Sequence, residues 1–123
     1  MNYPCPCCGY LVFREEPGSE EICPVCWWQD DISSLIHAEE ASGPNKVSLV
    51  EAQRNFQQIG VAESRLVLHI KANARDHYKK DPQWRPVDLR VDSFPVIGTP
   101  TERLPDPPDI SGLYYWRNPT HAH

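Results

Sequence analysis

The chain has 123 residues, which is enough for one domain, and we expect residues 1–123 to form a single one. Charged residues make up 24% of the chain and hydrophobic residues 40%, as in ordinary soluble proteins. The net charge is −5, and residues 1–60 carry nine acids against three bases, so nucleic acid is a poor default partner because its phosphates would be repelled.

The first residues, Met1 to Pro4, contain neither the basic region nor the apolar region of a signal peptide. Apolar runs elsewhere are far shorter than the roughly 20 residues that cross a bilayer. We therefore expect a cytoplasmic protein without a membrane anchor. Five cysteines cannot all pair within one chain, and in a reducing compartment clustered cysteines favour metal binding over disulfides.

Two C-x-x-C pairs, at residues 5–8 and 23–26, are separated by 14 residues. Tetrahedral zinc binds four thiolates delivered by two tight turns of this kind, here called knuckles. The linker is slightly shorter than the commonest spacing of about 15–20 residues. The pattern predicts one structural zinc ion, with iron as the less favoured metal. The predicted ligands are Cys5, Cys8, Cys23 and Cys26.

Two positions in the knuckles leave alternatives open. Cys7 occupies the variable position of the first knuckle, where we expect a small non-ligand residue; it could instead replace Cys5 or Cys8, or remain a free, redox-sensitive thiol. Gly9 suits the left-handed backbone that ends such a turn, but Trp27 stands at the corresponding position of the second knuckle. Either the metal compensates for strain at Trp27, or the second turn has a different geometry.

Residues 3–31 are predicted to form a zinc-ribbon-like β-hairpin. Residues 10–13 are aromatic and β-branched, residues 16–19 have turn chemistry, and residues 21–22 lead back to the second knuckle. Residues 32–41 have room for a helical turn, and residues 42–45 form the clearest break in the following loop.

An antiparallel helix pair is predicted over residues 48–80. Ser48 and Glu51 form a capping box, and Gly60 suits the left-handed position after the first helix. A second helix is expected from about Ala62 to Lys80. The apolar residues of the first helix recur at helical spacing: Leu49, Ala52, Phe56 and Ile59.

Residues 82–123 hold eight of the 13 prolines and are predicted to be mostly extended. Residues 87–91 alternate like a half-buried strand. Residues 113–116 are so apolar that we expect them to dock on the body or on a partner. The predicted fold is therefore small α+β: a ribbon packed on a helix pair, followed by an extended proline-rich segment.

Residues 3–10 (YPCPCCGY), 22–31 (ICPVCWWQDD) and 48–56 (SLVEAQRNF) resemble the bacterial cysteine-rich CPCC family, over about residues 3 to 70. The resemblance implies a cytoplasmic protein with a zinc-ribbon-like site. It also implies a possible immunity role, because some small cysteine-rich proteins of this kind are suspected to neutralise toxins. The chain departs from the family pattern after about Lys71.

We expect a non-enzymatic protein that acts by protein–protein interaction, in its concrete form an immunity protein that binds a toxin. The sequence shows no catalytic constellation and no phosphate-binding loop. The alternative is a rubredoxin-like iron electron carrier or thiol redox sensor, because Cys-Gly-Tyr and Cys-Pro-Val-Cys resemble rubredoxin's metal loops. A nucleic-acid-binding ribbon ranks third. Its support is a set of basic residues: Lys71, Arg75, Lys79 and Lys80.

Overall fold

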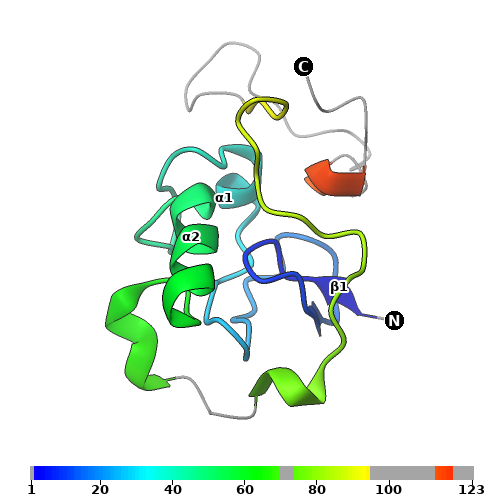
Figure 1. Cartoon of the computed structure of the whole chain (residues 1–123), viewed down its shortest axis with the longest axis vertical. Helices are drawn as coiled ribbons and strands as arrows, with labels where there is room; N and C mark the ends of the chain where they lie inside the picture. The colour runs from blue at the N-terminus through cyan, green and yellow to red at the C-terminus, as the bar shows by residue number, and fades with distance from the viewer. Residues whose placement is uncertain (1, 70–73, 95–112, 118–123) are drawn as a thin grey trace.

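The computed structural model describes residues 2–69, 74–94 and 113–117. Figure 1 shows α1 and α2 on one side of the N-terminal hairpin, and the segment that follows residue 77 passing along the hairpin. The elements, in chain order, are β1 (Tyr3–Pro4), β2 (Leu11–Phe13), α1 (Ile32–Ile36), α2 (Leu49–Ile59) and three 3₁₀-helices, η1 (Ser64–His69), η2 (Ala74–His77) and η3 (Tyr115–Arg117).

Each cysteine knuckle closes its own antiparallel pairing. β1 pairs with β2 across the first knuckle, with Tyr3 opposite Phe13. Ile22 pairs with Gln29 across the second knuckle. The predicted strand near residues 10–13 is confirmed, but its partner in the described sheet is β1 and not residues 21–22. Each knuckle is thus the turn of its own hairpin, and its two cysteines lie in that turn.

α1 begins where the second knuckle ends, in the region where a helical turn was expected. Its N-cap is Asp31, whose carboxylate accepts a hydrogen bond from the backbone N–H of Ser34 (2.9 Å). The loop that follows returns through Asn45, whose side chain both accepts from the N–H of Gln29 and donates to its carbonyl (3.0 Å each). These bonds fasten the loop to the strand that leaves the second knuckle.

α2 has the ends that the sequence predicts. The Ser48 hydroxyl accepts from the N–H of Glu51 (3.1 Å), and Gly60 is left-handed with φ +77°. The N–H of Gly60 donates to the carbonyl of Phe56. Leu49, at the start of the helix, is fully buried, whereas Ile59 at the end is 45% exposed. The N-cap at Ser48 and the left-handed Gly60 are confirmed; of the capping box, the bond from the Glu51 N–H to the Ser48 hydroxyl is present.

The predicted second helix, from Ala62 to Lys80, is wrong in the described residues. They form two short 3₁₀-helices, η1 and η2. Both ends of this segment are held at the knuckles: the N–H of Ala62 donates to the carbonyl of Cys26, and just after the segment the N–H of Asp81 donates to the carbonyl of Gly9. A straight α-helix would place its ends roughly 27 Å apart. The knuckle sulfurs lie within 4.8 Å of one another, so the segment has to double back.

The predicted strand at residues 87–91 is also wrong, because these residues form a turn. The Asp88 carbonyl accepts from the N–H groups of Val91 and Asp92. The Asp92 carboxylate accepts in turn from the N–H of Asp88 (2.8 Å) and from both guanidinium nitrogens of Arg85 (2.7 Å). Local side-chain bonds to the backbone outweigh the alternating pattern here.

The core joins the knuckles, α1, α2 and the residues near the C-terminus. Trp28 and Leu49 are fully buried, and Tyr115 is 1% exposed. Residues 113–116 dock on the body as expected. Apart from residues 113–117, the proline-rich segment after residue 94 lies outside the described residues. Within the described part of the chain, no helix has the length and apolar character needed to span a membrane.

Candidate metal centre

The first knuckle is a tight turn held by backbone hydrogen bonds. The N–H of Cys5 donates to the carbonyl of Tyr10 (2.9 Å), and the N–H of Gly9 donates to the carbonyl of Cys5 (2.7 Å). Gly9 has φ +81°, a conformation that glycine adopts at no steric cost. The turn therefore presents Cys5 and Cys8 toward the same side.

The second knuckle repeats this geometry without a glycine. The N–H of Cys23 donates to the carbonyl of Trp28 (2.8 Å), and the N–H of Trp27 donates to the carbonyl of Cys23 (2.9 Å). Trp27 has φ +70°. Of the two alternatives left open by the sequence, the structure has the strained one: tryptophan takes the glycine conformation, at a cost of about 1–3 kcal/mol.

The four predicted cysteines come together in one cluster. Their Sγ atoms all lie within 4.8 Å of one another, with Cys5 to Cys26 at 3.6 Å and Cys8 to Cys23 at 3.7 Å. Zinc–sulfur bonds of about 2.3 Å in tetrahedral geometry require sulfurs about 3.8 Å apart. None of the four thiols is in a disulfide, and all four are fully buried. Both the donor set and its spacing fit a tetrahedral thiophilic metal ion.

The protonation of the free thiols shows what a cation would change. Burial raises the pKa of the Cys5, Cys8 and Cys26 thiols above the ordinary value. Burial acts on Cys23 too, but hydrogen bonds from neighbouring thiols outweigh it and lower the pKa of Cys23. The cluster by itself thus favours fewer than four thiolates. A bound cation supplies the positive charge that lets all four deprotonate.

Cys7 does not join the cluster in the described geometry. It is fully buried, but its sulfur is outside the group of four that lies within 4.8 Å. Burial is the main cause that raises the pKa of Cys26, followed by a hydrogen bond with Cys23. Hydrogen bonding with Cys7 is among the smaller causes. Cys7 therefore lies beside the cluster, in the expected position of a small buried residue.

Two side chains far along the chain hold the first knuckle, and sequence reasoning missed both. The Pro6 carbonyl accepts from Gln53 Nε2 (3.0 Å) and from the indole N–H of Trp84 (2.9 Å). Gln53 is 2% exposed although it lies on a helix, and its amide also binds Tyr115 and Val87. The signal available in the sequence was its position next to Ala52, on the face predicted to be apolar.

The histidines do not contribute to the cluster. His37 is buried at the end of α1. His69 and His77 line a surface pocket next to the second knuckle, and no described group of three or more potential ligands includes them. His121 and His123 lie outside the described residues.

The fold and the cluster together define a small cysteine-rich protein with a four-thiol site suited to metal binding. The family model described as Cysteine-rich CPCC matches residues 3–77, and the chain belongs to this family. The match confirms the resemblance drawn from the knuckles and the start of α2, and it extends further, through η2. Among curated proteins none matches the chain.

Proposed function

We propose that this chain is a non-enzymatic protein whose cysteine cluster holds one structural zinc ion, and that it acts by binding another protein. The observation that carries the first part is the closed cluster. Its four sulfurs are fully buried and mutually close, so protein ligands fill every position of a tetrahedral ion. Catalytic zinc sites keep one position open for water or substrate.

The zinc ion would cross-link the two knuckles. The described sheet has only two short strands, β1 and β2, so few backbone bonds hold the hairpin. Structural zinc contributes about 10–16 kcal/mol of apparent binding free energy in small zinc domains. That amount also exceeds the strain at Trp27.

Binding to a protein is supported by the apolar surface. Leu68 is 93% exposed, Leu89 54% and Ile22 49%. A partner that covers such side chains removes apolar area from water, which favours association. The concrete form of this function is neutralisation of a toxin, as the family resemblance suggested. The aromatic residues near the C-terminus no longer support it, because Tyr115 is buried against the body.

Elemental analysis of the full chain, purified under reducing conditions, tests the metal. One zinc per chain and no visible absorption is the expected result. A red, iron-loaded protein with a reversible redox couple would instead make electron transfer the function.

Co-expression tests the toxin-neutralising form. The product of the adjacent upstream gene is produced with and without this chain, and we expect the chain to restore growth and to co-purify with that product. If the chain neither restores growth nor binds that product, the immunity role is ruled out. The metal result stands independently of this outcome.

A further inference from the structure

The peptide group that follows Pro6, in the first knuckle, is held by side chains from outside the knuckle. The Pro6 carbonyl oxygen accepts hydrogen bonds from Gln53 Nε2 (3.0 Å) and from the indole N–H of Trp84 (2.9 Å). A carbonyl oxygen has two lone pairs, so these two donors satisfy it completely. The donors are 47 and 78 positions away from Pro6 in the sequence, so these contacts are tertiary and not part of the turn itself.

This peptide group lies in the chain between two of the clustered cysteines, Cys5 and Cys8. Because a peptide group is planar, a fixed carbonyl direction also fixes the plane and points the following N–H away from the two donors. The proline ring already restricts φ at Pro6. The two donors therefore leave few backbone torsions free between the two cysteines.

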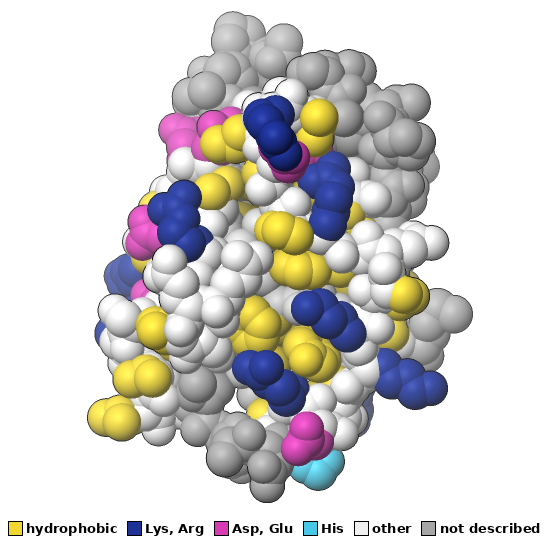
Figure 2. All heavy atoms as spheres, in the orientation of Figure 1, with side chains coloured by type: hydrophobic (Ala, Val, Ile, Leu, Met, Phe, Trp, Pro, Cys, Tyr) yellow, Lys and Arg dark blue, Asp and Glu magenta, His cyan; other side chains and the backbone are white. Residues whose placement is uncertain are grey.

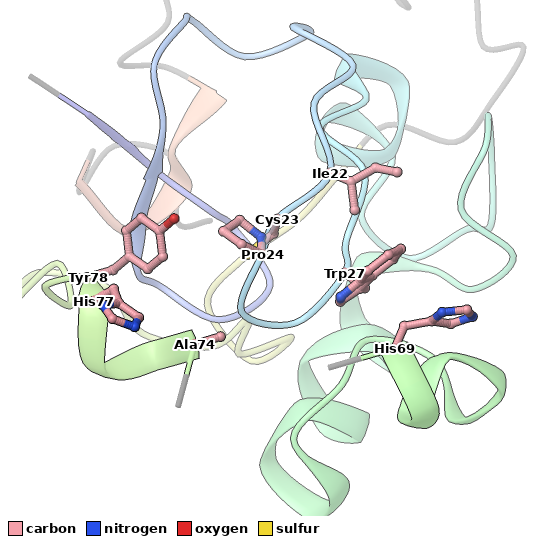
Figure 3. A pocket seen from close by; sticks show the side chains of 8 residues that line it. All are labelled: Ile22, Cys23, Pro24, Trp27, His69, Ala74, His77 and Tyr78. Carbon is pink, nitrogen blue, oxygen red and sulfur yellow. The ribbon is translucent and has the colours of Figure 1, made fainter. Parts of the chain in front are cut away.

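The second knuckle shows why the orientation of this peptide group matters. Pro24, at the corresponding position, lines a surface pocket with Trp27 and Tyr78, and Figure 3 shows it between these two side chains. The N–H that follows it, that of Val25, donates to the sulfur of Cys23 (3.4 Å). The plane of this peptide group thus determines whether its N–H can reach a ligand sulfur.

The two donors of the first knuckle are themselves held in place. The Gln53 amide also donates to the Tyr115 hydroxyl (2.8 Å) and accepts from the N–H of Val87 (2.7 Å). The ammonium of Lys80 lies over the Trp84 ring, 4.9 Å from its centroid. Figure 2 shows basic side chains beside hydrophobic ones on the face along which the segment after residue 77 runs. Contacts within the protein therefore preorganise both donors.

Most of these contacts come from beyond the region that the family model matches. That region is residues 3–77, whereas Trp84, Val87 and Tyr115 follow it in the chain. Gln53 lies inside the region, but its amide is bonded to the later residues. The first knuckle of the matched region is therefore held by residues that come after the match.

We propose that Gln53 and Trp84 are positioning residues of the metal site: through the Pro6 carbonyl they slow the release of the metal ion from the first knuckle. The inference rests on the proposed metal site and adds the residues that keep the ion bound. Release begins when one ligand turns away from the ion, and a knuckle with fewer free torsions allows this less often. Groups that orient the ligands of a metal ion typically change its affinity by about 10–100-fold.

The test measures zinc release from the full zinc-loaded chain into an excess of a chromogenic chelator. Trp84→Phe keeps a ring against Gly9 and removes the indole N–H that binds Pro6. It should release zinc about tenfold faster than the normal chain. Trp116→Phe is the matched control, because it also loses an indole hydrogen bond, but to the Asp81 carboxylate (3.2 Å) and not to the knuckle. Its release rate should stay close to that of the normal chain.

Gln53→Met is a second variant of the same contact. It keeps the length of the side chain but lacks the amide that donates to Pro6. It should also release zinc faster than the normal chain. In the double variant with Trp84→Phe, the two effects on the rate should not simply multiply, because both donors bind the same oxygen.

Cysteine alkylation during zinc release shows where the site opens. Iodoacetamide modifies thiols as they leave the metal, and trypsin cleavage after Arg14 separates the two knuckles for mass spectrometry. In Trp84→Phe, alkylation should rise first at Cys5 and Cys8 and later in the second knuckle. A general loss of stability would raise it in both knuckles alike, and urea denaturation of each variant measures that loss separately.

Equal zinc release by Trp84→Phe and Trp116→Phe would overturn the proposal, as would alkylation that rises equally in both knuckles. The zinc content of the normal chain distinguishes this inference from the proposed function. A normal chain that carries no metal ion would overturn the metal site and the inference with it. A metal-loaded chain whose Gln53 and Trp84 variants release zinc at the normal rate would overturn the positioning role alone.

Discussion

Gly9 and Trp27 end the two knuckles in the same left-handed conformation, with φ +81° and +70°. Their surroundings differ. A Cβ atom at Gly9 would lie 2.7 Å from Cγ and Cδ2 of Trp84, so the first knuckle has no room for a side chain. The second knuckle accommodates an indole, which faces the pocket. One knuckle is therefore specialised for packing and the other for display of a side chain.

Gly9→Ala should destabilise the zinc-loaded protein by more than the conformational cost of about 1–3 kcal/mol, because the new methyl group also collides with Trp84. Chemical denaturation measures the loss. Gly18→Ala is the matched control: its φ is +96°, but its nearest neighbour, Ile32 Cβ, lies at an ordinary 3.4 Å. Equal losses in the two variants would show that the contact with Trp84 contributes nothing.

Metal stoichiometry should separate Cys7 from the four clustered cysteines. Cys7→Ala should keep one metal ion per chain, since the Cys7 sulfur lies outside the cluster. Cys23→Ser should bind metal much more weakly and lose ordered structure, as should the normal chain treated with a strong chelator. Elemental analysis and circular dichroism provide the readouts. Loss of metal in Cys7→Ala would place Cys7 among the ligands.

Gln53→Ala should cost roughly 2–5 kcal/mol of stability. The amide of Gln53 donates to Pro6 and Tyr115 and accepts from the N–H of Val87 (2.7 Å), so truncation leaves buried polar groups unpaired. Urea denaturation of the metal-loaded protein measures the effect. Gln57→Ala, on the exposed side of the same helix, should change stability by less than about 0.5 kcal/mol. Similar values for both would contradict the role of Gln53.

Tyr115→Ala should destabilise the protein by about 3–5 kcal/mol without removing the metal. The ring is 1% exposed and packs edge-on against Phe94 and Trp116. Its hydroxyl donates to the Arg85 carbonyl (2.9 Å). Tyr115→Phe should lose only the hydroxyl's bonds, about 1–3 kcal/mol. Thermal unfolding compares the two variants, and an unchanged midpoint in Tyr115→Ala would mean that the tail does not dock in solution.

Features set by neighbouring residues were predictable. The spacing of the cysteines singled out the four sulfurs that cluster, because two tight turns can each deliver two thiols. The limits of α2 followed from Ser48 and Gly60, whose capping bonds join residues three or four apart. These interactions form wherever the local chain permits them, so the sequence carries their signal.

The errors occurred where distant contacts compete with local pattern. The segment after Gly60 has helical periodicity, yet its ends are hydrogen bonded to both knuckles and it bends back as η1 and η2. Residues 87–91 alternate like a strand, yet the carboxylate of Asp92 closes them into a turn. Hydrophobic periodicity indicates which side of a segment is buried. It does not indicate how far apart tertiary contacts hold the two ends of that segment.

The sequence alone determined which four cysteines cluster, the two knuckles, the capped helix α2 and membership of the cysteine-rich CPCC family. Only the tertiary structure decided that each knuckle pairs its own flanks, that Gln53 and Trp84 hold the first knuckle, and that Trp27 borders a pocket. The physical reason is the range of the interactions. Thiol spacing and capping act within a few residues, whereas Pro6 and Trp84 are 78 positions apart in the sequence and meet only once the chain between them has folded.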